Sequence, residues 1–110
     1  MQDGNWIDVG DAATLAGGGH IDAEVDDLPV TIVSGAGTLH AFEDRCSHDG
    51  EPLAGAEIEP DTECGAAVIC PRHGARFCLR TGAALTPPAY EAIRVFEVRE
   101  RNGRIEVRQP

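Results

Sequence analysis

Lysine is absent from this 110-residue chain, and arginine is its only permanently charged basic side chain. Nine arginines are outnumbered by 19 Asp and Glu residues, which gives a formal net charge of −10. Because such a surface repels phosphate backbones and anionic lipid headgroups, we expect neither a nucleic-acid partner nor a membrane partner. The same charge favours docking on a basic patch of another protein.

Long apolar runs and a basic leader are also missing. No run approaches the roughly 18 residues that span a bilayer, and the opening MQDGNWIDVG lacks the basic and apolar regions of a secretory signal. We therefore expect a cytoplasmic protein whose cysteines are reduced. With only five aromatic side chains, its core must be mostly Val, Ile, Leu and Ala, and a bound metal centre would stabilise so small a domain.

Short alternating apolar runs, separated by Gly, Pro and Asp, predict one all-β domain over residues 1–110. The dipeptide Asn102–Gly103 is a strong hairpin-turn signal between the last two runs. Strands at this spacing indicate an antiparallel sandwich or barrel. Only residues 11–16 are typical of a helical turn, and residues 49–65 and 80–89 are expected to be loops. The expected strands are 20–25, 29–34, 38–42, 66–70, 75–79, 92–98 and 104–108.

Two short pieces carry half of the four cysteines and half of the four histidines. They are CSHDG, with Cys46 and His48, and CPRHG, with Cys70 and His73. Two thiolates and two imidazoles can surround a metal, and such pairs rarely arise by chance in a Cys-poor intracellular chain. Zinc is one interpretation, because Cys2His2 is a common structural zinc set. Zinc sites more often join Cys-x-x-Cys to His-x3–5-His, so the spacing does not favour zinc but leaves the metal open.

The two pieces also resemble a known motif. CSH followed by CPRHGARF is similar to C-x-H…C-x-x-H-G, the cluster-binding motif of Rieske [2Fe–2S] proteins, and most of all to the small ferredoxins that serve bacterial oxygenases. The resemblance extends to FCLRTG at residues 77–82, to Pro87–Pro88 and to the closing hairpin. It implies a Rieske-like antiparallel β-sandwich or barrel. It also implies a small cluster-binding subdomain of two loops, about 43–52 and 69–80.

The resemblance implies one [2Fe–2S] cluster as the cofactor, with Cys46 and Cys70 on one iron and His48 and His73 on the other. With two neutral imidazoles in place of two thiolates, the oxidised centre has no net charge and the reduced centre has a charge of about −1. In a centre with four thiolates, reduction would change the net charge from about −2 to −3, and adding an electron to a more negative centre is less favourable. Replacing thiolate by imidazole therefore raises the reduction potential.

High-potential relatives place hydroxyl donors near cluster sulfur and tie the two loops with a disulfide. The matching positions here hold Ala75 and Phe77, which have no side-chain donor, and Glu51 and Arg72, which cannot form the disulfide. The resemblance therefore implies a potential near the bottom of the Rieske range, roughly −150 to −50 mV.

Residues beside the two loops allow two interpretations each. Arg45, Arg72 and Arg76 are either solvated surface charges or groups that offset the charge of the reduced cluster or contact a partner. Pro87 and Pro88 form either a stiff third loop over the cluster or an ordinary turn.

The remaining cysteines and histidines are expected to be structural. Cys64 and Cys78 would be offset by several residues in a hairpin around the second loop, so we expect buried thiols rather than a disulfide. His20 and His40 lie in strand-like runs. The segment PDTECG, residues 60–65, looks like an insertion relative to the family.

We expect a one-electron carrier rather than an enzyme. It would be a monomeric ferredoxin that takes electrons from a flavin-dependent reductase and passes them to a terminal oxygenase or a similar acceptor. An oxygenase would need a second iron site of two His and one carboxylate, and only His20 and His40 remain for it. The alternatives are a small redox or regulatory subunit resembling that of assimilatory nitrite reductase, and a structural zinc module. Acidic residues near the loops either dock on a partner or only confer solubility. These residues are Glu43, Asp44, Asp49 and Glu51.

Overall fold

The computed structural model describes residues 5–35, 37–47, 50–71, 74–86 and 91–109. In this part of the chain every strand pairing is antiparallel and the only helix is a short 3₁₀ segment, so the expected all-β class is confirmed. None of its helical segments is long and apolar enough to cross a membrane. The elements are β1 Ile7–Asp11, η1 Ala12–Gly18, β2 His20–Val25, β3 Leu28–Gly35, β4 Thr38–Glu43, β5 Glu57–Thr62, β6 Gly65–Ile69, β7 Arg76–Cys78, β8 Val95–Arg101 and β9 Arg104–Arg108.

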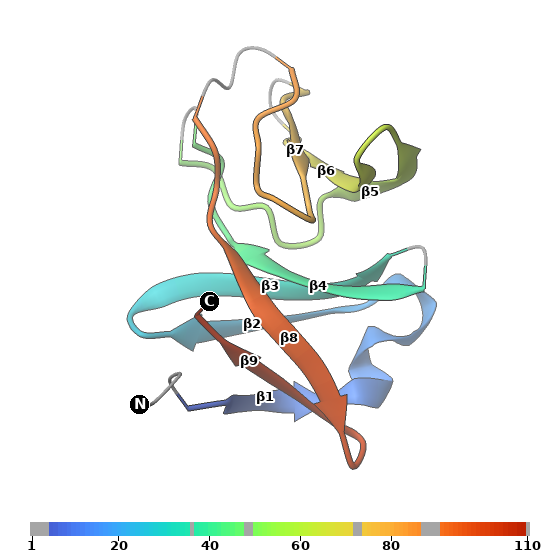
Figure 1. Cartoon of the computed structure of the whole chain (residues 1–110), viewed down its shortest axis with the longest axis vertical. Coiled ribbons are helices and arrows are strands. Elements are labelled where there is room, and N and C mark those ends of the chain that lie inside the picture. The colour runs from blue at the N-terminus through green and yellow to red at the C-terminus, as the bar shows by residue number, and fades with distance from the viewer. Residues whose placement is uncertain (1–4, 36, 48–49, 72–73, 87–90, 110) are drawn as a thin grey trace.

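Six strands form a curved, nearly closed sheet in the order β1-β9-β8-β4-β3-β2 (Figure 1). The strands expected at 20–25 and 104–108 coincide with β2 and β9. Asn102 and Gly103 join β8 to β9 with positive φ at both residues, as a type I′ hairpin turn requires. The core of this sheet is aliphatic apart from one phenylalanine. Its buried members are Leu15, Ile21, Val25, Val30, Ile32, Ala41, Phe96, Ile105 and Val107.

Two of the strands were not expected from the sequence. β1 pairs with β9 through a register shift between Asp8 and Gly10. β5 lies in a stretch that was expected to be a loop. The expectation arose because its sequence, EIEPDT, has low β-propensity. β5 is an edge strand, and Pro60 lies within its register shift, a position where proline is tolerated. The loop expected over residues 49–65 is therefore wrong for its second half, and the apparent insertion PDTECG is the end of β5 with its turn into β6.

A smaller sheet, in the order β5-β6-β7, stands over the face of β3 and β4 in Figure 1. A second buried cluster fills the space between this sheet, its loops and the large sheet. Leu53, Val68 and Phe77 contribute to it from the small-sheet side, and Val33 and Phe42 contribute from the large sheet. The small sheet therefore packs on the large sheet through a shared buried cluster.

β3 and β4 are shared by the two cores. Val30 and Ile32 of β3 belong to the core of the large sheet, whereas Val33 belongs to the second cluster. In β4, Ala41 and Phe42 divide in the same way. Successive side chains of a strand point to opposite faces, so a strand buried on both faces has a nearly continuous apolar run. This explains why the segment LPVTIVSG of β3 does not alternate.

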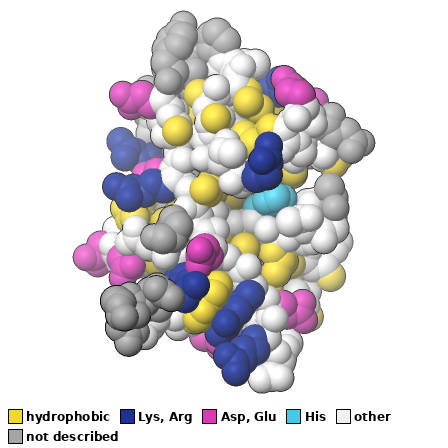
Figure 2. Space-filling view, in the orientation of Figure 1, with side chains coloured by type: hydrophobic (Ala, Val, Ile, Leu, Met, Phe, Trp, Pro, Cys, Tyr) yellow, Lys and Arg dark blue, Asp and Glu magenta, His cyan; other side chains and the backbone are white. Residues whose placement is uncertain are grey.

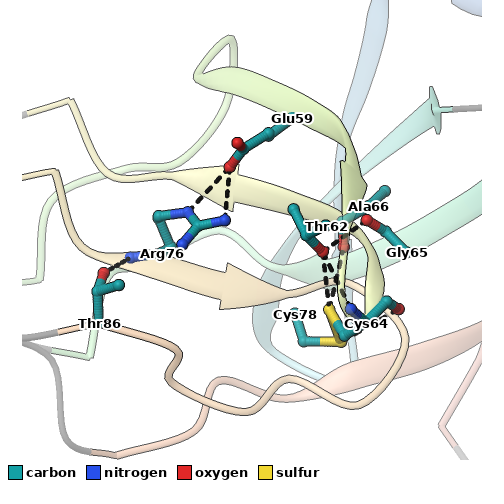
Figure 3. Close-up of polar contacts among 8 residues, drawn as sticks. All are labelled: Glu59, Thr62, Cys64, Gly65, Ala66, Arg76, Cys78 and Thr86. Carbon is teal, nitrogen blue, oxygen red and sulfur yellow. Dashed lines mark hydrogen bonds and ion pairs between the residues drawn. A yellow bond between two sulfur atoms is a disulfide. The ribbon is translucent and has the colours of Figure 1, made fainter.

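Cys64 and Cys78 form a disulfide, so the expectation of two reduced, buried thiols is wrong for this pair (Figure 3). The hairpin offset does not apply, because Cys64 lies in the turn between β5 and β6 rather than within a paired strand. The turn brings the Cα atoms of the two residues to 6.2 Å, which is within disulfide range, although Cys78 pairs with Ala67 in the sheet. The disulfide joins the β5–β6 turn to the end of β7.

Candidate metal centre

The two cysteines expected to bind metal begin turns of the same kind. The amide of Cys46 donates to the carbonyl of Glu51 at 2.8 Å, and the amide of Gly50 donates back to the carbonyl of Cys46 at 2.8 Å. In the second turn, the amide of Cys70 donates to the carbonyl of Ala75 at 2.7 Å, and the amide of Gly74 donates to the carbonyl of Cys70 at 3.0 Å. The two cysteines therefore occupy equivalent places in two closed loops.

Glycine is required at the fifth position of each turn. The φ angle is +78° at Gly50 and +73° at Gly74, in the left-handed region that side chains with a Cβ rarely adopt. The last residue of each pentad therefore has a conformational role.

The side chains of Cys46 and Cys70 are both buried and belong to the same cluster, with Leu53, Ala75 and Phe77 among its other members. Neither takes part in the Cys64–Cys78 disulfide. Two sulfur donors, 24 positions apart in the sequence, are thus buried in the same apolar cluster. Thiolates are the protein ligands that iron–sulfur clusters use, so this pair fits such a centre.

The expected histidine ligands, His48 and His73, lie outside the described residues, as do Asp49, Arg72 and Pro87–Pro88. Among the residues that the structure describes, no group of three His, Cys, Asp or Glu side chains is placed to hold a metal ion. Two of the four expected ligands are thus buried in one cluster, and the ligand set as a whole stays a prediction.

A third turn of the same kind was missed by the sequence analysis. The amide of Cys78 donates to the carbonyl of Ala83 at 2.9 Å, and that of Gly82 donates to the carbonyl of Cys78 at 2.7 Å. The signal was present, since CLRTGA at residues 78–83 matches CPRHGA at 70–75 except for Leu79 in place of Pro71 and Thr81 in place of His73. The third turn therefore repeats the two backbone hydrogen bonds of the second turn, with Cys78 in the disulfide and threonine at the position of the histidine.

Two of the acidic residues named for docking hold the first loop in place. One carboxylate oxygen of Asp44 accepts hydrogen bonds from the amides of Leu53 and Ala54 at 2.6 and 2.7 Å. Charge-assisted hydrogen bonds of this length are strong, and they hold in place the segment that follows the loop beginning at Cys46. Glu43 accepts from the amide of Arg94 at 3.2 Å, and its side chain is only 14% exposed. These two carboxylates therefore have structural partners.

The arginines beside the loops also differ in role. Arg76 forms an ion pair with Glu59, with Nε and Nη2 at 2.9 and 2.7 Å from the same carboxylate oxygen, which links β7 to β5 (Figure 3). Its charge is thus largely balanced by Glu59. Arg45 is exposed, and among the described residues it forms a loose ion pair with Glu43 at 3.8 Å. Surface pairs of this kind contribute little stability.

The two remaining histidines make local contacts. His20 lies 2.9 Å from the carboxylate of Asp22. His40 is half-buried, and burial lowers its pKa, although the backbone carbonyls of Gly35 and Leu79 oppose that shift. His40 also lines a groove of about 360 Å³ between the two sheets. The expectation that both histidines are structural agrees with these contacts.

Comparisons with known proteins agree with the geometry. The family described as the Rieske [2Fe–2S] domain matches residues 5–97. The 3-phenylpropionate/cinnamic acid dioxygenase ferredoxin subunit of Escherichia coli strain K12 is 36% identical over 87 residues, which cover 78% of this chain and 78% of that protein.

Solved structures give the same fold. The ferredoxin of carbazole 1,9a-dioxygenase from Nocardioides aromaticivorans IC177 matches with a TM-score of 0.84 and 24% identity, over 97% of this chain and 100% of that chain. A complex of reduced oxygenase and oxidized ferredoxin in carbazole 1,9a-dioxygenase matches with a TM-score of 0.79 and 26% identity, over 94% of this chain and 92% of that chain. The Rieske-like architecture expected from the sequence is therefore confirmed.

Proposed function

Because this chain belongs to the Rieske [2Fe–2S] family and carries one [2Fe–2S] cluster, we propose that Cys46 and Cys70 bind one iron and that His48 and His73 bind the other. The observation that carries this assignment is the placement of Cys46 and Cys70, both buried in one cluster and both at the first position of equivalent turns. The pentads place one histidine in each of the same two turns, so the ligand set contains two thiolates and two imidazoles.

The protein is an electron carrier and a component of an oxygenase system, not a catalyst itself, like the ferredoxin subunits that it matches. The bound cluster supplies a one-electron redox couple. The chain's own residues hold it: the matching turns present the sulfur donors, and Asp44 fixes the return of the first loop. The apolar cluster around Cys46 and Cys70 keeps water away from the sulfur ligands.

We propose a flavin-dependent reductase as the electron donor and a terminal oxygenase as the acceptor. The name of the E. coli relative, a dioxygenase ferredoxin subunit, and the solved oxygenase–ferredoxin complex of carbazole 1,9a-dioxygenase support the acceptor. A monomeric state and a cytoplasmic location belong to the same proposal. We assign no acidic docking patch, because the carboxylates of Glu43 and Asp44 accept hydrogen bonds from backbone amides of the protein itself. Figure 2 also shows acidic and basic side chains interspersed on the visible face.

The purified protein is expected to be red-brown and to contain about two iron atoms and two acid-labile sulfides per chain. It should take up one electron, and pulsed EPR of the reduced form should detect two coupled imidazole nitrogens. Iron and sulfide analysis with EPR checks both statements. A folded, colourless protein with stoichiometric zinc would contradict the cluster, and the absence of nitrogen coupling would contradict only the histidine ligands.

Replacing His48 by cysteine is expected to lower the reduction potential by about 100 mV or more, or to prevent cluster assembly. The added thiolate makes the reduced centre more negative and moves it toward the roughly −400 mV of ferredoxins with four thiolates. Protein-film voltammetry measures the shift. His20→Gln is the matched control, because His20 lies outside both pentads and its side chain bonds to Asp22, so the potential should be unchanged. An unaltered potential in His48→Cys would remove His48 from the ligand set.

A further inference from the structure

The groove of about 360 Å³ between the two sheets has a lining drawn from both buried clusters. Ala66 and Leu79 line it from the small-sheet side, and Ala41 and Phe96 line it from the large sheet. The cysteines assigned to the cluster are not among its lining residues. Sites for small organic molecules have volumes of roughly 300–1,000 Å³ and a mostly apolar lining. The groove therefore has the size and the lining of a ligand site apart from the metal centre.

The groove differs in charge from the rest of this acidic chain. Asp and Glu account for 19 of the 110 residues, yet none of the described lining residues is acidic, and Arg80 is one of them. Two acids adjoin lining residues in the sequence, Glu63 and Glu97, and Glu97 is ion-paired with Arg108. Charges are screened beyond about 8 Å at physiological ionic strength. The arginine in the groove therefore matters more to a bound anion than the net charge of the whole chain.

The guanidinium group of Arg80 is held at one end. Its Nε donates to the backbone carbonyl of Cys64 at 3.3 Å, and both residues line the groove. No carboxylate among the described side chains forms an ion pair with Arg80. Nη1 and Nη2 can thus form the two parallel hydrogen bonds with which a guanidinium binds a carboxylate. Figure 2 shows a histidine and an arginine side chain at the level where the two sheets meet, with apolar side chains around them.

Contacts within the protein hold the walls of the groove in place. The Cys64–Cys78 disulfide fixes the β5–β6 turn to the end of β7. The amide of Leu79 donates to the carbonyl of Ala66 at 2.9 Å. The ring of His40, which lines the groove from β4, contacts the backbone carbonyl of Leu79 and so joins the large sheet to the small-sheet side. A groove that is formed in advance loses little conformational freedom when a ligand binds.

We propose that this groove binds a small organic monocarboxylate with an apolar body, of the arylalkanoate class. The carboxylate pairs with the guanidinium group of Arg80, and the apolar body lies against Leu79 and Phe96. A protein partner fits less well, because stable protein interfaces bury about 800 Å² on each partner, whereas a concave site of this volume holds one small molecule. The site lies apart from the cluster loops, so the proposal does not depend on which residues bind the iron.

Titration of the purified, cluster-loaded protein with phenylacetate tests the proposal. Calorimetry and the amide NMR shifts of Gly65 and Arg80 should show saturable binding of one molecule per chain, with a Kd of about 1 mM or tighter for a ligand of this size. Phenylacetamide has the same shape without the charge, and acetate has the charge without the ring. Each should bind at least about tenfold more weakly, because each lacks one half of the recognition.

Substitutions in the groove separate a specific site from weak surface binding. Arg80→Gln should weaken phenylacetate binding at least about tenfold, since a charge-assisted hydrogen bond is lost. Thr38→Glu should have a similar effect, because Thr38 is exposed on the lining and a carboxylate there repels the anion. Arg101→Gln is the matched control. It removes the same charge from the exposed end of β8, outside the groove, and should leave the affinity unchanged.

Four results would overturn the proposal. Three of them concern the ligand: no saturable binding of phenylacetate up to about 10 mM, equal affinities for the acid and its amide, or equal losses in Arg80→Gln and Arg101→Gln. The fourth comes from sedimentation of the wild-type protein. A dimer that Thr38→Glu dissociates would assign the groove to a second copy of this chain.

Discussion

Replacement of either Cys46 or Cys70 by alanine is expected to abolish the visible absorption of the purified protein and to reduce its iron content from about two atoms per chain to nearly none. Each substitution removes a thiolate from a centre with two, and the alanine methyl group cannot bind iron. The variants should also melt earlier, because the empty cluster-binding loops lose the metal that holds them together. Absorption spectra and iron analysis after anaerobic purification measure the effect.

Cys64→Ala is the matched control for these substitutions. It removes a cysteine from the turn between β5 and β6 and breaks the disulfide with Cys78, but does not alter either of the two cysteine turns. It should keep its full colour and lose only stability, by about 3 kcal/mol or less for a loop of this size. A fully coloured Cys46→Ala or Cys70→Ala protein would exclude that residue as a ligand. Loss of colour in Cys64→Ala would show that the disulfide is needed for the centre.

Gly82→Ala is expected to cause the largest loss of stability among single methyl additions in the described loops. Gly82 has a φ of +83°, and a Cβ built there would lie 2.0 Å from the carbonyl oxygen of Ile93. Ile93 is buried, and its amide donates to the carbonyl of Gly82 at 2.9 Å. The methyl group must therefore displace a backbone segment of the core. Strain at positive φ costs about 1–2 kcal/mol, and the displacement should bring the total to about 3 kcal/mol or more.

The matched control is Gly37→Ala, in the turn between β3 and β4. Gly37 has a similar φ of +79°, but no atom lies within 4 Å of the position of its Cβ. This variant therefore measures the cost of the backbone conformation alone. Melting followed by circular dichroism should show a fall of more than about 10 °C for Gly82→Ala and of only a few degrees for Gly37→Ala. Equal losses would show that the contact with Ile93 relaxes without cost.

Features with a local signal could be predicted from the sequence. β2 and β9 were predicted residue for residue, because alternation and the Asn102–Gly103 turn are local patterns. The cysteine ligands were chosen from a pentad whose turn geometry depends on its own glycine. Cys46 and Cys70 are buried in the same cluster, and all four ligands, with His48 and His73, stay predictions.

Features that depend on distant contacts could not be predicted in the same way. β5 forms despite Pro60, which has no N–H group to donate. At an edge position and within a register shift, the sheet does not require a hydrogen bond from that residue. The Cys64–Cys78 disulfide depends on how a turn folds beside the sheet, which the spacing of the two cysteines does not encode. The sequence predicts a surface acid at Asp44, but its partners are amides nine and ten residues further along the chain.

The two-faced character of β3 limits how the length of this chain can vary. A one-residue deletion within β3 would exchange the two faces of the strand beyond it, because side chains alternate with a period of two. Val30 and Ile32 would then turn toward the metal-binding side, and Thr31, which is fully buried and bonded to Asp22, would turn into the aliphatic core. Insertions and deletions within β3 should therefore prevent folding, whereas those in hairpin turns such as the one between β8 and β9 should be tolerated.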